Sequence, residues 1–340
     1  MEFLSARVET MSTHEIPLGN TYRTARSRQI LNSIPHYLTE LGHVRSPRGY
    51  FEWLQFKLPY LFPVPSFPPR ITLELTNECN LACRHCHRNE MNRPVGMMDG
   101  DLLEKLAVEI GRHPECTVKI GGLGEPALHP NCKKLMTMFR DRGIRSAFYT
   151  NGTLLHQVPH EELLREWKIP HLIVSVDGLD AKSYEQIRVG GEYARLRSAL
   201  RAFFTARNEL GYKRPLIEVR HVLFPHETES QVAAFKRFWL RIADTVMFNP
   251  FVPHGSVKTC GSSHQRRCRD IRREFYIRWN GLTPLCGYQY LVAAQEWIAD
   301  LHNTSVQEAW HLKRLQELRA MHRRGIQAVP DFCKLCHQTA

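Results

Sequence analysis

Three cysteines in the first third of the chain have a spacing that suits a metal or a metal cluster. Cys79, Cys83 and Cys86 lie in the segment CNLACRHCH, separated by three and then by two residues. A tight loop with these spacings can turn three sulfur atoms toward one small object and leave one coordination position open. Four interpretations fit the set: zinc with His87 as a fourth ligand, the C-x-x-C-H pattern of c-type haem attachment, cysteines without a ligand, and a [4Fe-4S] cluster held by three thiolates. Haem attachment would leave Cys79 unexplained.

Four further cysteines lie near the end of the chain, at Cys268, Cys286, Cys333 and Cys336. Four thiols suit a tetrahedral zinc ion or a fully ligated [4Fe-4S] cluster, and the spacing alone does not choose between them. Five arginines between positions 266 and 273 surround the first of these cysteines. They can offset the negative charge of a cluster, bind a phosphate of a substrate, or form a solvated face.

The composition is that of an ordinary globular protein. The 340 residues are 43% apolar and 24% charged, which excludes a disordered, collagen-like or coiled-coil chain. Since no apolar run reaches about 18 residues and residues 1 to 30 lack the pattern of a secretory signal, we expect a cytoplasmic protein with no membrane partner. Clustered cysteines in a reducing compartment are then metal ligands or redox groups. The net charge of +12 suits an anionic ligand or nucleic acid, but no aromatic residues interleave with the basic stretch, which disfavours RNA binding.

Short apolar runs that alternate with longer helical patterns indicate the elements that position these residues. Six runs predict strands, at residues 71–76, 117–122, 145–150, 172–176, 217–224 and 245–251. Helical patterns follow at 101–111, 132–142, 160–167, 194–210 and 231–242. The alternation predicts an α/β fold, and six units are too few to close an eight-unit barrel, so we expect a partial (β/α)6 TIM-like barrel. Functional groups then belong at the C-terminal ends of the strands.

The chain divides into three predicted zones. Residues 1–69 form a helical N-terminal extension with patterns at 23–41 and 49–61 and a Pro-rich end, and residues 70–257 form the partial barrel. Residues 258–340 hold the second cysteine set, a predicted hairpin at Asn280-Gly281 and a helical run at 306–324. This last zone is too small for a strong core of its own, so we expect a metal or cluster as its nucleus.

The segment TNECNLACRHC, directly after the first predicted strand, resembles the C-x3-C-x2-C signature of the radical SAM superfamily. The resemblance implies that Cys79, Cys83 and Cys86 bind three irons of a [4Fe-4S] cluster and that S-adenosylmethionine chelates the fourth. It also implies cleavage of S-adenosylmethionine to a 5'-deoxyadenosyl radical, which abstracts a hydrogen atom from a substrate. His85 departs from the family pattern, which usually has an aromatic residue at that position.

Later strand ends resemble the same family and imply a binding site for S-adenosylmethionine. The segment GGLGEP after the second strand is similar to the family's Gly-Gly-Glu-Pro motif, whose glycines admit a close ligand and whose glutamate accepts from the methionyl amine. Ser175 and Asp177 are expected to bind ribose hydroxyls, and Arg188 is expected to pair with a carboxylate. Strand-capping turns and a solvated arginine are the plain structural alternatives for these positions. The expected cofactor-binding residues are Gly122, Gly124, Glu125, Asn151, Ser175, Asp177 and Arg188.

The order of the second cysteine set resembles the SPASM/twitch branch of the superfamily, as in enzymes of the 2-deoxy-scyllo-inosamine dehydrogenase type. That resemblance implies a second, auxiliary [4Fe-4S] cluster on Cys268, Cys286, Cys333 and Cys336, placed as an electron acceptor. The lone Cys260, just beyond the sixth strand, is a candidate catalytic hydrogen donor or else a small buried apolar residue.

The resemblance to this branch also implies the reaction class and the partners. We expect oxidation or epimerisation of a small polar molecule such as a sugar, aminocyclitol or nucleoside, with a flavodoxin- or ferredoxin-type reductant. The alternative is modification of a ribosomally synthesised peptide, and a lesser alternative is modification of RNA.

Overall fold

The computed structural model describes residues 51, 54–55, 58–252, 268–287, 297–325, 328–331 and 333. Cys260, Cys336 and the helical pattern at 23–41 lie outside the described residues, as does part of the pattern at 49–61. No helix in the described ranges is long and apolar enough to cross a membrane.

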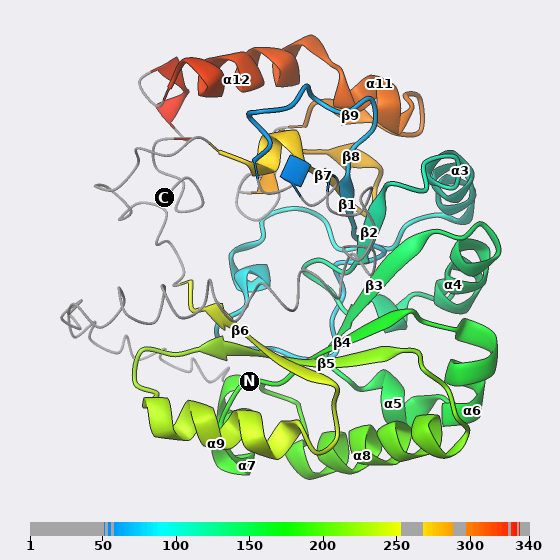
Figure 1. Cartoon of the computed structure of the whole chain (residues 1–340), viewed down its shortest axis with the longest axis vertical. Coiled ribbons are helices and arrows are strands. Elements are labelled where there is room, and N and C mark those ends of the chain that lie inside the picture. Colours follow the sequence, from blue (N-terminus) through cyan, green and yellow to red (C-terminus); the bar gives the residue numbers. More distant parts are fainter. Residues whose placement is uncertain are drawn as a thin grey trace, which may run out of the picture.

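One sheet of seven parallel strands forms the centre of the molecule (Figure 1). Its strand order is β6-β5-β4-β3-β2-β1-β7, so the sheet is not closed and β6 and β7 are its edges. The strands are β1 (Arg70–Leu73), β2 (Thr117–Ile120), β3 (Arg145–Thr150), β4 (His171–Ser175), β5 (Leu216–Leu223), β6 (Thr245–Pro250) and β7 (Glu274–Ile277). The predicted α/β partial barrel and its six strands are confirmed.

Helices cover the outer face of this sheet (Figure 1). In β1 and β2, Ile71, Leu73, Val118 and Ile120 are buried in the core, while the residues between them are half-buried. Because successive side chains of a strand point to opposite faces, one face packs on the helices and the other lines the inside of the barrel. The helices are α3 (Gly100–Ile110), α4 (Cys132–Asp141), α5 (Leu154–Gln157), α6 (His160–Glu162, continued by a π-turn Leu163–Trp167), α7 (Ala181–Ile187), α8 (Tyr193–Glu209), α9 (Glu229–Trp239), α11 (Val306–Trp310) and α12 (Lys313–Arg324).

The seventh strand comes from the zone after residue 258 and is absent from the sequence prediction. β7 pairs in parallel with β1 over four residues, and Phe275 and Ile277 are buried in the same core as the barrel strands. Its Glu274 accepts from Arg70 Nη1 at 2.6 Å and from Lys119 Nζ at 3.2 Å. The C-terminal segment therefore continues the barrel sheet beyond β1.

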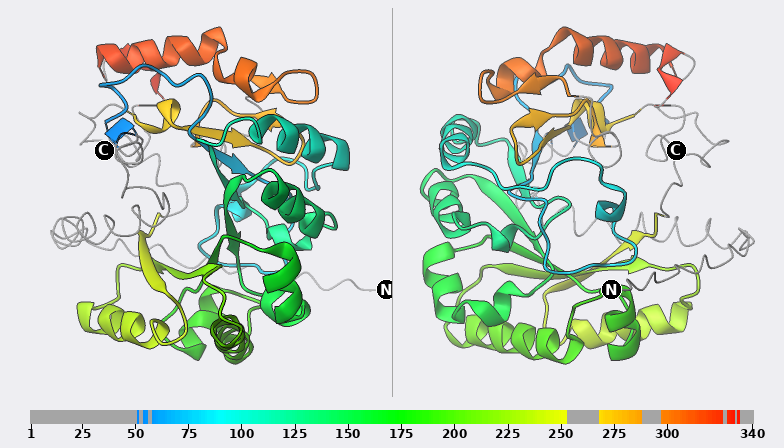
Figure 2. Two further views of the ribbon diagram at one scale, coloured as in Figure 1. Left: turned by 45° about the vertical axis from the view of Figure 1, so that its right-hand side comes forward. Right: turned by 180° about the vertical axis from the view of Figure 1, so that it is seen from behind.

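The remaining C-terminal elements pack beside this edge (Figure 2). The predicted turn at Asn280-Gly281 exists, with Gly281 at φ +73° and Arg278 N–H bonded to Leu282 O at 3.1 Å. The strand that follows it, β8 (Leu282–Thr283), pairs with β9 (Ala299–Asp300) instead of with β7, so the predicted simple hairpin is wrong. The helical run at 306–324 is divided into α11 and α12, because Leu312 has extended backbone angles.

Candidate functional site

The loop after β1 carries the first cysteine set to the C-terminal ends of the strands. Cys79, Cys83 and Cys86 are partly buried, and the backbone N–H groups of Leu81 and Arg88 contact Cys79 Sγ at 3.5 Å and Cys86 Sγ at 3.4 Å. Burial raises the pKa of the Cys83 thiol to about 11, while the two neighbouring cysteines also raise it. The three thiols are therefore close to one another, and a strong positive centre, such as cluster iron, would favour ionisation of Cys83.

Zinc at this loop would need His87 as its fourth ligand. Within the described ranges, no three His, Cys, Asp or Glu side chains are arranged to hold one ion. His87, the fourth ligand of the zinc interpretation, has its Nδ1 atom 2.9 Å from Glu90 Oε2.

The Gly-rich segment after β2 packs against the start of the cysteine loop. Glu125 N–H donates to Glu78 O at 2.7 Å, directly before Cys79. A Cβ atom on Gly124 would lie 2.3 Å from Thr76 O, so no other residue fits without a shift of backbone. The glycine is expected to allow a ligand to approach closely. In this structure the group that lies close to Gly124 is the backbone of the chain itself. Gly122 lies exposed in the same loop.

Glu125 is a buried carboxylate directly below the cysteine loop. Its Oε2 atom accepts from Asn151 N–H at 2.6 Å and its Oε1 atom from Ala127 N–H at 3.2 Å. Burial raises the pKa of Glu125 to about 7, although both backbone donors oppose the shift. The Asn151 amide in turn donates to Asn80 Oδ1 at 2.7 Å and lies 3.9 Å from Cys79 Sγ. Glu125 and Asn151 thus connect the ends of β2 and β3 to the cysteine loop, and their contacts with a cofactor stay a prediction.

Asp177, beyond the end of β4, has several partners within the chain. Its Oδ2 atom accepts from Arg188 Nη2 at 2.6 Å and lies 3.2 Å from His85 Nε2, and its Oδ1 atom accepts from Val222 N–H at 2.7 Å. Burial alone would raise the pKa of Asp177, but the Arg188 guanidinium and His85 hold it below its usual range. Arg188 does meet a carboxylate, and this carboxylate belongs to Asp177. Ribose binding by Ser175 and Asp177 stays a prediction.

The contact of Asp177 with His85 ties the end of β4 to the cysteine loop. His85 stands between Cys83 and Cys86, and its ring also meets the Phe224 ring edge-on at 5.6 Å between centroids. The departure from the family pattern at His85 therefore has a structural counterpart, because the side chain at this position contacts the Asp177 carboxylate.

Glu74 is a site residue that the sequence analysis missed. It is fully buried, and its carboxylate accepts from both terminal nitrogens of Arg93 at 2.7 and 2.6 Å. It also lies 3.4 Å from Leu123 N in the Gly-rich segment and 3.4 Å from Trp279 N after β7. Its only sequence signal is a charged residue inside an apolar run, ITLELT, where a charge must find a partner.

The inner face of the sheet near β4 is polar. Arg220 on β5 stands opposite Ser175 in the strand register, donates from Nη1 to the Tyr149 hydroxyl at 2.9 Å and stacks on that ring. Its Nε atom donates to the buried Glu218 at 2.7 Å. Hydrogen-bonding side chains therefore line the barrel beside the strand ends.

The second cysteine set is partly described. Cys268 is buried, and burial raises its pKa to about 12, while Asp270 and Cys286 also raise it and the Ile271 backbone N–H lowers it. Cys286 therefore lies close enough to Cys268 to affect its pKa. Cys333, which follows α12 in the chain, is buried. Arg272, one of the five neighbouring arginines, is itself buried and donates to Pro59 O at 2.9 Å, so it is not part of a solvated face.

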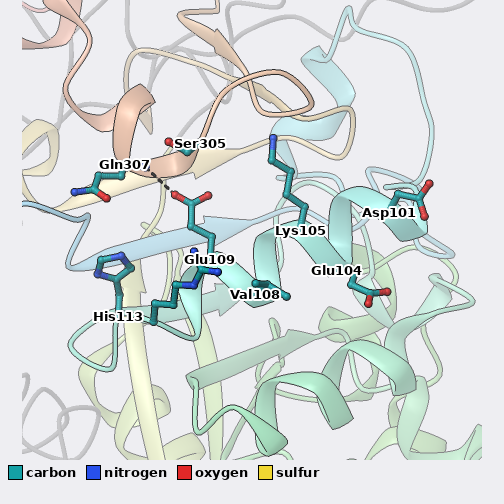
Figure 3. A pocket seen from close by; sticks show the side chains of 9 residues that line it. Asp101, Glu104, Lys105, Val108, Glu109, His113, Ser305 and Gln307 are labelled. Atoms are coloured by element: carbon teal, nitrogen blue, oxygen red, sulfur yellow. Dashed lines mark hydrogen bonds between the residues drawn. The ribbon is translucent and has the colours of Figure 1, made fainter.

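A groove of about 560 Å³ is lined by residues of α3 and by Ser305 and Gln307 (Figure 3). Lys105 Nζ donates there to Leu301 O at 2.6 Å, and Glu109 accepts from the backbone N–H groups of Val306 and Gln307, both at 3.0 Å. These charges cap exposed backbone of the C-terminal segment, so the groove marks where that segment packs on α3.

Residues 73–238 match the sequence profile of the radical SAM superfamily. The chain is 28% identical over 184 residues to the tungsten-containing aldehyde ferredoxin oxidoreductase cofactor-modifying protein of Pyrococcus furiosus, covering 53% of this chain and 51% of that protein. It is 29% identical over 130 residues to a probable GTP 3',8-cyclase of Methanococcus maripaludis, covering 38% of this chain and 43% of that one. The chain thus spans about half the length of the curated relatives it matches.

Solved structures share the fold. Streptococcus suis SuiB, bound to its precursor peptide SuiA, superimposes with a TM-score of 0.61 at 15% identity, covering 93% of this chain and 76% of SuiB. The sequence match and the open parallel sheet agree, and both support the assignment of residues 73–238 to the radical SAM superfamily.

Proposed function

We propose that this protein is a radical SAM enzyme that removes a hydrogen atom from a small polar substrate, leading to its oxidation or epimerisation. The observation that carries the substrate class is the polar inner face beside the strand ends. Arg220, Tyr149 and Glu218 form a hydrogen-bonded set there, next to Ser175 in the register. A sugar, aminocyclitol or nucleoside presents hydroxyl groups that such donors and acceptors bind.

The residues of the cysteine loop fit the cofactors of this chemistry. Cys79, Cys83 and Cys86 are mutually close, and burial raises the pKa values of the Cys79 and Cys83 thiols, which favours a ligand that supplies positive charge. They would hold three irons of a [4Fe-4S] cluster, and this cluster with S-adenosylmethionine supplies a 5'-deoxyadenosyl radical when both are bound.

Other residues of this chain would bind and orient S-adenosylmethionine. Glu125 would accept from the methionyl amine, since a buried carboxylate pairs strongly with a cation. Asn151 would hold Glu125 and the cysteine loop in position, through its hydrogen bonds to Glu125 and Asn80. Ser175 and Asp177 would face the ribose, with Arg188 keeping Asp177 ionised.

An auxiliary [4Fe-4S] cluster on Cys268, Cys286, Cys333 and Cys336 is part of the proposal. Four thiolate ligands would leave no iron open to substrate, so this cluster would serve as an electron acceptor in an oxidation. Cys260 is proposed as the hydrogen donor in the case of epimerisation. Residues 258–340 would then form a twitch-like unit, preceded by the barrel at 70–257 and an N-terminal extension at 1–69.

Peptide modification is the second candidate. Its support is the likeness in fold to SuiB, which is bound to a precursor peptide and covers 93% of this chain. The similarity to a probable GTP 3',8-cyclase instead favours a small polar substrate. Incubation with candidate sugars, nucleosides and precursor peptides under dithionite, followed by detection of substrate-dependent 5'-deoxyadenosine, separates the two candidates.

Iron content tests the cofactor proposal directly. After anaerobic reconstitution the full chain should bind about eight irons, and the variant with Cys79, Cys83 and Cys86 replaced by Ala about four, with no cleavage of S-adenosylmethionine. The matched control is Cys132→Ala, since Cys132 is buried in the core, and it should keep all the iron. One zinc ion per chain at the rear cysteines, together with about four irons in the unmodified chain, would refute the auxiliary cluster.

Turnover in D2O tests the role of Cys260. A hydrogen-donating thiol exchanges with solvent, so epimerisation should place one deuterium at the attacked centre, and Cys260→Ala should stop that incorporation. Normal turnover of Cys260→Ala, with no solvent deuterium in the product, would assign the reaction to oxidation instead.

A further inference from the structure

His322 on α12 presents a buried hydrogen-bond donor that lacks an acceptor among the described residues. The side chain is 1% exposed, and its Nδ1 atom accepts from the backbone N–H of Cys268 at 3.3 Å. Because Nδ1 accepts this hydrogen bond, it carries no proton, and the proton of the ring lies on Nε2. This Nε2 atom has no hydrogen-bond partner in the described part of the chain.

Arg319, one turn earlier on the same helix, also presents a buried donor without an acceptor among the described residues, and its side chain is charged. It is 3% exposed, donates from Nε to Ile271 O at 2.8 Å and from Nη1 to Trp310 O at 2.7 Å. Its Nη2 atom is buried without a partner, and the described residues give Arg319 no carboxylate. A buried guanidinium stays charged, so its burial is costly unless an anion compensates it.

Both donors belong to one side of α12, because residues three apart lie on the same face of a helix. Both also contact the short segment that begins at the first rear cysteine, through Cys268 N–H and Ile271 O. Arg272 in that segment adds a second buried cation to that of Arg319. The surroundings of Cys268 therefore hold excess positive charge and unused N–H groups, and these call for an anionic acceptor.

We propose that His322 Nε2 and Arg319 Nη2 donate hydrogen bonds to sulfur atoms of the auxiliary cluster and raise its reduction potential. The inference rests on the proposed auxiliary cluster. A reduced cluster carries one more negative charge than the oxidised one, so nearby donors and cations stabilise it more. The pair thereby makes the cluster a better acceptor for the electron released in substrate oxidation.

The experiment uses the full chain with Cys79, Cys83 and Cys86 replaced by Ala, so that only the rear site can bind iron. After reconstitution, iron and zinc are counted, and the midpoint potential is measured by titration with dithionite and detection of the reduced cluster by electron paramagnetic resonance. His322→Asn keeps an acceptor for Cys268 N–H but lacks a donor at the Nε2 position. His322→Gln restores an N–H group near that position, and His302→Asn, at a partly exposed histidine of the same segment, is the matched control.

We expect His322→Asn to retain its iron and to show a more negative potential, with His322→Gln returning toward the parent and His302→Asn unchanged. An unshifted potential of His322→Asn at full iron content would overturn the role of His322. If His322→Asn does not hold iron, Arg319→Lys decides the question in the same titration, since lysine keeps the charge but lacks the Nη2 donor. A parent that binds zinc or no iron refutes the auxiliary cluster itself, and the inference falls with it.

Discussion

We expect Gly124→Ala to weaken the packing of the cysteine loop on the Gly-rich segment, rather than to act directly on a bound ligand. The new Cβ atom would lie 2.3 Å from Thr76 O, 2.4 Å from Glu78 O and 2.8 Å from Asn77 Cα, all of them backbone atoms. Overpacking of this kind costs about 1–3 kcal/mol. Separating the segments would also weaken the 2.7 Å hydrogen bond from Glu125 N–H to Glu78 O, which contributes about 1 kcal/mol. We therefore expect a loss of about 3 kcal/mol in the free energy of unfolding, together with a lower iron content at the first cluster.

Urea unfolding followed by tryptophan fluorescence measures the first quantity, and iron analysis after reconstitution measures the second. Gly100→Ala is the matched control, because its Cβ atom would have Asn131 Nδ2 as its nearest neighbour, at an ordinary 3.6 Å, and alanine favours the helix that begins there. That variant should be as stable as the parent or more so. Full stability and full iron in Gly124→Ala, with weakened binding of S-adenosylmethionine alone, would show that Gly124 faces the cofactor and would refute the packing argument.

Three further predictions follow from single contacts. The methionyl amine needs an ionised Glu125, whose pKa burial raises to about 7, so affinity for S-adenosylmethionine should rise up to about tenfold per pH unit from pH 5 toward 7 in equilibrium dialysis. Glu125→Gln should remove this dependence, and an unaltered pH profile would exclude Glu125 as the partner of the amine. Asp177→Asn leaves the guanidinium of Arg188 buried without its carboxylate, which should cost about 3–5 kcal/mol in urea unfolding, and a cost below about 1 kcal/mol would mean that water reaches the pair. Glu109→Ala removes the acceptor of two backbone N–H groups of α11, so the protection of Val306 and Gln307 against hydrogen exchange should fall by about 1 kcal/mol. Unchanged exchange would mean that another group caps α11.

The six barrel strands could be predicted because each is an apolar run followed by a helical pattern. β7 could not, since it follows an Arg-rich stretch and lies beyond the alternation of strands and helices that marks the other six. Its assignment to the barrel depends on pairing with β1, about 200 residues earlier in the chain, and on the burial of Phe275 and Ile277 against the common core. Neither is a local property of the sequence.

The residues of the site likewise divide into those that the sequence could predict and those that it could not. Short motifs mark the cysteines and Glu125 because their spacing along the chain is itself the signal. The partners of Asp177 carry no such mark: His85 stands in the cysteine loop, Arg188 follows α7 and Val222 belongs to β5. Sequence reasoning could expect a carboxylate for Arg188 but not which one, because either a ligand or the protein itself can satisfy a guanidinium.

Glu74 gives a physical reason why the barrel and the C-terminal segment should behave as one unit. Its buried carboxylate holds Arg93 on the return of the cysteine loop and lies near backbone N–H groups of the Gly-rich segment and of the turn after β7. The Trp279 side chain also donates to Pro94 O at 3.3 Å and fills the space beside Gly96, where a Cβ atom would lie 2.5 Å from the indole. A shift of β7 would therefore disturb the loop that carries the first cysteine set. Since β1 lies between β2 and β7, the loop after β1 is braced on one side by Gly124 and on the other by Trp279, and loss of either contact should lower the occupancy of the same cluster.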